Sequence, residues 1–217
     1  MLMNKQIAID GPAASGKTAV GKTISNRLDW SFLDTGLMYR AATKLVLDNN
    51  ADIYDSETTL SIIEKATFQL EMNSTETKII SNGIDYSNLL RTPEIDANVS
   101  ILSKYTGVRK ILVKHQQKMA VDTRIVMVGR DITTVVLPNA FIKIYLDASL
   151  NERALRRYKE SQTQTVEQIK YNISIRDTYD KNRNDSPLLK SKDAWVINTT
   201  EMTVESVSNL IISKVNK

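Results

Sequence analysis

Residues 11–18 read Gly-Pro-Ala-Ala-Ser-Gly-Lys-Thr, which is the G-x-x-x-x-G-K-[ST] pattern of a loop that binds phosphate groups. The loop follows an apolar run at residues 5–10 and precedes a segment whose apolar residues repeat on one helical face. A helix that starts here leaves unpaired backbone N–H groups at its N-terminus, and these groups attract phosphate. We therefore expect a strand, a phosphate-binding loop and a helix, with Lys17 reaching the phosphates and Thr18 in the shell of a bound Mg²⁺. The alternative is a glycine-bearing turn that binds no ligand.

The rest of the chain continues this alternation of short apolar runs and helical segments. Five runs have the length of a buried strand, at residues 5–10, 31–34, 124–128, 142–146 and 194–197. Helical periodicity covers residues 35–49, 94–105 and 108–121, and further helix starts with capping-box spacing occur at Ser149 with Glu152 and at Thr165 with Gln168. Strands separated by helices predict an α/β fold with a five-stranded parallel sheet flanked by helices.

One interval departs from this alternation. Apolar and polar residues alternate over residues 67–72, the run resumes at residues 78–81, and Asn82-Gly83 is a tight-turn signal. This pattern predicts a small antiparallel β subdomain inserted into the α/β core. The chain has 217 residues and no internal repeat or linker-like segment, so we expect a single domain over residues 1–217.

Composition excludes several kinds of chemistry. The chain has no cysteine, which excludes thiol nucleophiles, disulfides and thiolate metal sites. Its one histidine, His115, cannot form a multi-histidine metal site, and we assign it no function. No stretch approaches the ~20 apolar residues of a membrane helix, and the first residues lack the apolar core of a signal peptide. We therefore expect a cytoplasmic protein without a membrane partner.

The basic residues are unevenly distributed. The formal net charge is +4, and residues 151–192 hold ten Lys or Arg against six Asp or Glu, which equals the whole surplus. This stretch indicates either a segment that covers an anionic ligand or a solvated basic surface. Aromatic residues make up only 6% of the chain and form no stacking pattern, so we expect no nucleic-acid partner.

The phosphate-binding loop alone leaves the reaction open. The N-K-x-D and D-x-x-G motifs of GTPases do not occur in the expected places, and motor or helicase ATPases need a longer chain. Small-molecule kinases remain, and they need a second anion site, because the acceptor's phosphate must be held against repulsion from the donor. Candidate arginines for that site lie in motifs at residues 33–40, 107–109, 129–131 and 176–183. Each could instead form a surface ion pair, and Arg176 with Asp180 has the i, i+4 spacing of a structural pair.

Taken in order, these motifs resemble the bacterial cytidylate kinases, the CMP/dCMP kinases of the nucleoside monophosphate kinase superfamily. The likeness extends from Ile7 to about Ile212. It is carried by IDGPAASGKT at residues 9–18, LDTG and YR at 33–36 and 39–40, RTPE at 91–94, GRD and TVV at 129–131 and 134–136, LDAS at 146–149, ERA and RR at 152–157, and the arginine-rich segment 176–188.

The resemblance implies a fold, a reaction and a cofactor. The fold is that of the P-loop kinases, with an inserted subdomain for the nucleoside monophosphate at about residues 64–92 and a helical lid at about residues 153–185. The reaction is phosphorylation of CMP and dCMP by ATP, which gives CDP or dCDP and ADP. Mg²⁺ is the implied cofactor, and a monomer is the implied form.

The resemblance also implies the residues of the site. ATP would contact the phosphate-binding loop and two lid arginines, namely Gly11, Pro12, Ala13, Ala14, Ser15, Gly16, Lys17, Thr18, Arg156 and Arg157. CMP would contact Thr35, Arg40, Ser100, Arg109, Arg130, Asp131, Arg176, Asp180 and Arg183. Within this set Ser100, Arg109 and Asp131 would read cytosine, Arg40, Arg130 and Arg183 would hold the phosphate beside Thr35, and Arg176 and Asp180 would contact the sugar. The catalytic residues would be Lys17, Arg130 and Arg183, and Thr18 would hold the metal.

The chain departs from the usual residues of this family at four positions. Thr133 stands where a glycine is usual and Ile84 where an acidic residue is usual, while Tyr179 and Lys181 stand at positions that are often arginine. Two other functions stay open. One is a kinase of the same fold that acts on UMP or on a non-nucleotide acceptor, and the other is a nucleotide-binding or RNA-binding protein without turnover.

Overall fold

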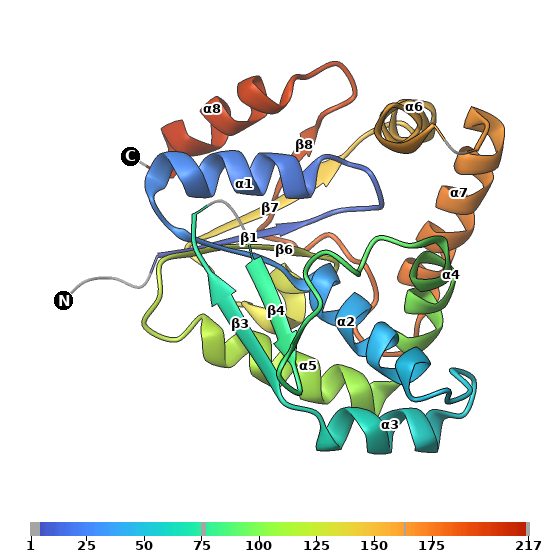
Figure 1. Ribbon diagram of the computed structural model, residues 1–217. Helices are drawn as coiled ribbons and strands as arrows, with labels where there is room; N and C mark the ends of the chain where they lie inside the picture. Colours follow the sequence, from blue (N-terminus) through green and yellow to red (C-terminus); the bar gives the residue numbers. More distant parts are fainter. Residues whose placement is uncertain (1–4, 75–76, 163, 216–217) are drawn as a thin grey trace.

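A five-stranded sheet runs through the middle of the molecule in the strand order β2-β6-β1-β7-β8, and all neighbouring strands are parallel (Figure 1). The computed structural model describes residues 5–74, 77–162 and 164–215. The strands are β1 (Gln6–Asp10), β2 (Ser31–Asp34), β6 (Ile125–Gly129), β7 (Ile142–Asp147) and β8 (Trp195–Asn198). The five predicted strands are therefore confirmed, each to within one residue at either end.

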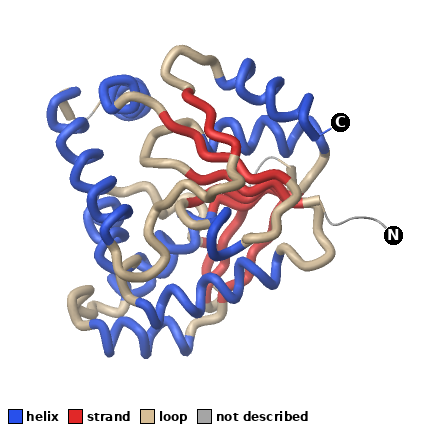
Figure 2. Tube along the Cα trace, turned by 180° about the vertical axis from the view of Figure 1, so that it is seen from behind, coloured by secondary structure: helices blue, strands red, loops and turns tan. Residues whose placement is uncertain are grey.

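Helices cover both faces of this sheet, as the view from behind shows (Figure 2). On one face α1 (Lys17–Leu28) packs against α8 (Val204–Val215) over a shared apolar core. On the other face α2 (Thr35–Asp48), α3 (Ser56–Lys65), α4 (Pro93–Leu102) and α5 (Thr106–Met119) share a second core. The predicted α/β fold with a flanked parallel sheet is confirmed.

Two further helices lie beyond the carboxyl end of β7. These are α6 (Leu150–Ser161) and α7 (Val166–Asn182), which pack against each other (Figure 1). The side chain of Ser149 accepts a hydrogen bond from the N–H of Glu152 and caps α6. Thr165 and Gln168 form the reciprocal capping box of α7 that their spacing predicts. Within the described ranges, no helix combines the length and the apolar character needed to cross a membrane.

The strand sequences are apolar because the sheet is covered on both faces. All residues of β6 are buried, and so are the last four residues of β1. Such strands read as continuous apolar runs rather than as alternating patterns. β8 forms one edge of the sheet and leaves Val196 exposed.

The predicted antiparallel subdomain is a three-stranded sheet in the order β3-β4-β5. Its strands are β3 (Phe68–Met72), β4 (Thr77–Ser81) and β5 (Ile84–Asp85). Asn82 and Gly83, the two residues between β4 and β5, have φ angles of 50° and 78°, the left-handed values that a two-residue hairpin of this kind requires. The Thr77 hydroxyl donates to the carbonyl of Phe32 at 2.7 Å, which attaches the small sheet to β2.

Candidate active site

A cleft of about 1100 Å³ opens at the carboxyl ends of the sheet strands. This edge is where open parallel α/β sheets bind their ligands. Residues 13–20, the start of α2, and parts of α4, α6, α7 and the loop after β8 line the cleft. The structure therefore brings segments from the whole length of the chain to one place.

The phosphate-binding loop lies between β1 and α1 in the shape that its glycines allow. A Cβ atom on Gly11 would lie 2.1 Å from the carbonyl oxygen of Leu146, so a side chain cannot be accommodated there. Gly16 is the N-cap of α1 and has a φ of 92°. Gly16, Lys17 and Thr18, at the start of α1, line the cleft, and the free N–H groups of a helix N-terminus attract phosphate.

Lys17 lies under this loop and is almost fully buried. Its Nζ donates to the carbonyl oxygen of Pro12 at 2.6 Å and to the hydroxyl of Ser15 at 3.2 Å. Burial, together with the positive charge of Arg130, holds the pKa of Lys17 well below its ordinary value. An anion beside the amine would reverse that effect, so the protein environment favours a charged lysine most when a phosphate is near.

Thr18 and Asp34 form an oxygen-rich pair beside the loop. The Thr18 hydroxyl donates to Oδ2 of Asp34 at 2.8 Å, and Oδ1 of Asp34 accepts from the N–H of Gly36 at 3.0 Å. Mg²⁺ prefers oxygen ligands and takes most of them from substrate and water. A hydroxyl and a carboxylate beside a phosphate-binding loop are therefore suitable ligands for it. Asp34 was not among the predicted site residues, although its place at the carboxyl end of β2 was a usable signal.

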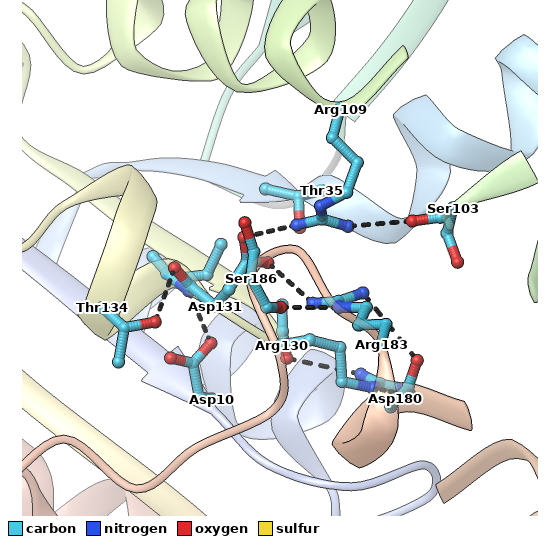
Figure 3. A network of polar contacts seen from close by, with 12 residues as sticks. Asp10, Thr35, Ser103, Arg109, Arg130, Asp131, Thr134, Asp180, Arg183 and Ser186 are labelled. Carbon is cyan, nitrogen blue, oxygen red and sulfur yellow. Dashed lines mark hydrogen bonds and ion pairs between the residues drawn. The ribbon is translucent and has the colours of Figure 1, made fainter. Parts of the chain in front are cut away.

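Three of the five arginines predicted for the acceptor, Arg109, Arg130 and Arg183, come together with the carboxylates of Asp131 and Asp180 (Figure 3). Arg130 Nε donates to Oδ2 of Asp180 at 2.7 Å, and Arg109 Nη2 donates to Oδ2 of Asp131 at 2.5 Å. Arg183 joins the two pairs, since its guanidinium lies 3.5 Å from Oδ1 of Asp131 and 4.0 Å from Oδ1 of Asp180. Three of the four arginine motifs, at residues 107–109, 129–131 and 176–183, therefore meet in one network.

This network carries more donors than its own acceptors use. The guanidinium atoms Arg109 Nε and Arg176 Nε are buried and have no hydrogen-bond partner, and the same holds for the Tyr39 hydroxyl. Arg183 Nη2 is also buried without a hydrogen bond and has only its 3.5 Å ion pair with Asp131. All four side chains line the cleft. Buried donors without partners are costly, and an anionic ligand with several oxygen atoms would satisfy them.

The charges around Asp180 and Arg176 perturb both groups. Burial alone would raise the pKa of Asp180, but Arg130, Arg176 and Arg183 hold it below its ordinary value. Burial, followed by the charge of Arg130, lowers the pKa of Arg176 to about 10. Asp180 bonds to Arg130 rather than to Arg176, so the alternative of a simple i, i+4 pair between Arg176 and Asp180 is not what the structure contains.

The other predicted residues line the cleft as well, except Gly11 and Pro12 of the phosphate-binding loop, which are not among its lining residues. Ser100 and Thr35 line the cleft. The Thr35 hydroxyl donates a hydrogen bond to the carbonyl oxygen of Val128 at 3.0 Å. Arg156 donates to Glu152 and to the hydroxyl and carbonyl of Thr199, and these bonds hold it beside the phosphate-binding loop.

A buried ion pair between Arg153 and Asp177, which the sequence did not indicate, is hydrogen-bonded to the phosphate-binding loop. Arg153 Nη1 donates to Oδ2 of Asp177 at 2.6 Å and to the carbonyl of Ala13 at 3.1 Å. Oδ1 of Asp177 accepts from the N–H of Ala13 at 3.2 Å. The pair therefore connects α6 and α7 to a loop residue through both of that residue's backbone groups.

Thr133, one of the four departures from the residues usual in the family that the chain resembles, has defined contacts in the structure. It lies in a short π-helical turn, Ile132–Val136, and its hydroxyl donates to Oδ2 of Asp10 at 2.7 Å. The N–H groups of Ile132 and Thr133 donate to the same carboxylate. Burial nevertheless raises the pKa of Asp10 to about 6. The threonine therefore adds a third donor to a buried carboxylate that needs one.

Comparison with known proteins decides the family. A family model described as cytidylate kinase matches residues 7–217. The chain belongs to the cytidylate kinase family. Among its relatives, the cytidylate kinase of Bacillus cytotoxicus is 39% identical over 97% of this chain and 96% of its own, and that of Ligilactobacillus salivarius is 41% identical over 98% and 97%. The predicted family and the predicted kinase class are confirmed.

The known structures add support for the fold alone. A crystal structure of an uncharacterized protein from Eubacterium ventriosum aligns with a TM-score of 0.51, covering 98% of this chain and 99% of its own, at 13% identity.

Proposed function

We propose that the protein transfers the γ-phosphoryl group of ATP to CMP or dCMP and so forms ADP and CDP or dCDP. The observation that carries this proposal is the single cleft in which a phosphate-binding loop faces buried arginines with unpaired N–H groups. One half of such a cleft suits the donor's phosphates and the other half suits the acceptor's phosphate. The active form would be a monomer, as the resemblance to the monophosphate kinases implies.

The donor side would consist of residues 11–18 with Arg156 and Arg157. Lys17 and the loop N–H groups would bind the β- and γ-phosphates and stabilise the charge that develops during transfer. Thr18 and Asp34 would hold Mg²⁺, which supplies positive charge next to the phosphoryl group. The protein forms no covalent bond in this scheme, so its contribution is positioning, charge neutralisation and exclusion of water.

The acceptor side would use the buried network. Arg40, Arg130 and Arg183 would hold the phosphate of CMP, and Arg176 with Asp180 would contact the sugar. Asp131, kept in place by Arg109, would accept a hydrogen bond from the exocyclic amino group of cytosine, with Ser100 nearby. Uracil has a carbonyl at that position, and a carboxylate would repel it.

The two segments around the cleft have proposed roles as well. The small sheet β3-β4-β5, within residues 64–92, would be the subdomain that closes over the monophosphate. Residues 153–185, which contain most of α6 and all of α7, would be the lid over ATP. Lid closure would exclude water, because an open site would hydrolyse ATP without an acceptor.

A panel of acceptors tests the proposal. ADP formation from MgATP would be measured with CMP, dCMP, UMP, AMP, GMP and shikimate at equal concentrations, and without acceptor as a control. We expect turnover with CMP and dCMP well above that with the others. Failure of every acceptor, with ATP still bound, would remove the assignment of the acceptor side. Turnover with UMP or shikimate alone would favour the other kinase functions.

A further inference from the structure

One carboxylate joins the two halves of the cleft. Asp96, in the first turns of α4, accepts from Arg40 Nη2 at 2.5 Å through Oδ1 and lies 3.3 Å from Arg157 Nη2 through Oδ2. Arg40 belongs to α2 and Arg157 to α6. Asp96 itself lines the cleft and leaves about a third of its side chain, 35%, exposed. The three side chains therefore form a bridge from the acceptor side to the lid helices.

The other contacts of both arginines leave this bridge replaceable. Arg40 is held independently by the carbonyl of Leu90, which accepts from Nη1 at 3.0 Å. Arg157 also bonds to Glu160 on its own helix, at 3.0 Å. Each guanidinium thus has one contact that fixes its position and one contact, with Asp96, that a stronger anion could take over. Both side chains of the Arg157–Asp96 pair are about a third exposed, at 34% and 35%, and such pairs contribute little to stability. At Arg40 a phosphate offers more charge and more acceptor oxygens than the carboxylate it would replace.

Phosphate and Asp96 would compete for the same N–H groups. A phosphate bound at Arg40 places negative charge next to the carboxylate, and like charges at such a distance repel each other. Asp96 uses one oxygen atom for each arginine, so a displacement of the whole carboxylate away from a phosphate at Arg40 changes both contacts, and the longer contact with Arg157 is the weaker one. Binding on the acceptor side would therefore free an arginine on the donor side.

We propose that Asp96 is an internal competitor for phosphate that couples the two substrate sites, because arrival of the acceptor's phosphate at Arg40 releases Arg157 for ATP. This inference rests on the proposed function. It makes Asp96 a positioning residue, since it acts through the two arginines and not on the reacting atoms. By linkage, bound ATP would raise the affinity for CMP by the same factor.

The first test is the thermodynamic coupling between the two ligands. The dissociation constant of a non-hydrolysable ATP analogue with Mg²⁺ would be measured by calorimetry, with and without saturating CMP. For the natural chain we expect CMP to tighten analogue binding by roughly fivefold or more, within the usual range of coupling between sites. In Asp96→Asn each ligand should bind alone more tightly than to the natural chain, and the coupling factor should fall to about one.

Kinetics provide a second readout that a purely structural role would not give. Removing the competitor should tighten the binding of each substrate to the free enzyme. Asp96→Asn should therefore lower each KM by about three- to tenfold when the other substrate is well below saturation, and leave kcat and the KM at saturating co-substrate unchanged. Glu160→Gln is the matched control, because it removes the other carboxylate of Arg157 without touching Arg40. That variant should keep the coupling. Asp96→Ala removes the same charge and should behave like Asp96→Asn.

The outcomes separate this inference from the proposed function. Raised KM values in both Asp96 variants, or a coupling factor that stays at its natural value in them, would overturn the role of Asp96 while leaving the kinase reaction in place. If the natural chain neither bound nor phosphorylated CMP, the proposed function would fail instead. Coupling that disappears in both Asp96 variants and persists in Glu160→Gln would establish the inference.

Discussion

The ion pair under the phosphate-binding loop makes the sharpest energetic prediction. Asp177 and Arg153 are both buried, with 7% and 6% of their surfaces exposed, and together they bind the N–H and the carbonyl of Ala13. Replacement of Asp177 by Asn keeps an oxygen that can accept from Ala13, but it leaves the Arg153 guanidinium buried without a counter-charge. The change therefore isolates the charge of the pair from most of its packing.

The expected loss of stability comes from the Arg153 guanidinium, which Asp177→Asn leaves buried without a counter-charge. Removing one partner of a buried pair costs about 3–5 kcal/mol, and the retained acceptor places Asp177→Asn near the lower value, about 3 kcal/mol. For a protein of this length each kcal/mol lowers Tm by about 2–4 °C, so we expect a fall of about 6–12 °C. Because Ala13 belongs to the loop, KM for ATP should rise by roughly tenfold, equivalent to about 1.4 kcal/mol, while KM for CMP changes much less.

Chemical denaturation, calorimetry and steady-state kinetics measure these effects. Glu205→Gln is the control, since it breaks an exposed pair with Arg27, 3.0 Å long, and should leave Tm nearly unchanged. The double variant Arg153→Met with Asp177→Asn removes the stranded charge and should recover part of the stability. A loss below about 1 kcal/mol in Asp177→Asn, the range of surface pairs, would refute the reasoning.

Three other substitutions test the site. Lys17→Ala should reduce turnover by about a hundredfold or more with an unchanged circular dichroism spectrum and intact CMP binding, and near-normal turnover would contradict the role of the lysine. Asp34→Asn should raise the Mg²⁺ concentration for half-maximal rate by about tenfold, measured against Asp29→Asn at the far end of α1, whereas equal Mg²⁺ curves would exclude Asp34 from the metal site. Thr133→Val should lower the free energy of unfolding by about 1.5–3 kcal/mol at pH 8, where Asp10 is ionised and its hydrogen bonds are charge-assisted. Because the pKa of Asp10 is raised to about 6, that loss should shrink as pH falls through 6, and a loss independent of pH between 8 and 5 would contradict the assignment.

The sequence predicted the elements whose patterns are local. Strands buried on both faces leave continuous apolar runs, and the capping box of α7 follows from two residues three positions apart. The approach of the arginine motifs could also be anticipated, because each follows a strand or flanks a helix that ends at the same edge of the sheet. These inferences needed no knowledge of side-chain contacts.

Two helices were not predicted although signals for them exist. α3 is short, but Asp55 caps it by accepting from the N–H groups of Glu57 and Thr58. In α8 the buried residues Val207, Ile211 and Val215 repeat every four positions. Predicted helix ends also shifted, since 94–105 becomes Pro93–Leu102 and 108–121 becomes Thr106–Met119. Helix ends depend on single capping contacts, which periodicity does not resolve.

The contacts that Asp96 and Asp177 make around the site could not be predicted from the sequence. Asp96 lies 56 residues from Arg40 and 61 from Arg157, and Asp177 lies 164 residues from Ala13. An aspartate on a helix surface has no pattern that names a partner at such a separation. These contacts depend on how the helices pack, and only the folded chain reveals them.

The central claim is that the acceptor side selects cytosine through Asp131. One reaction with equal concentrations of CMP and UMP tests it most directly, because the ratio of CDP to UDP formed equals the ratio of the two kcat/KM values. We predict that CDP exceeds UDP by at least roughly tenfold in the natural chain and that the excess falls sharply in Asp131→Asn. Equal formation of CDP and UDP by the natural chain, or an excess that Asp131→Asn leaves unchanged, would contradict the account.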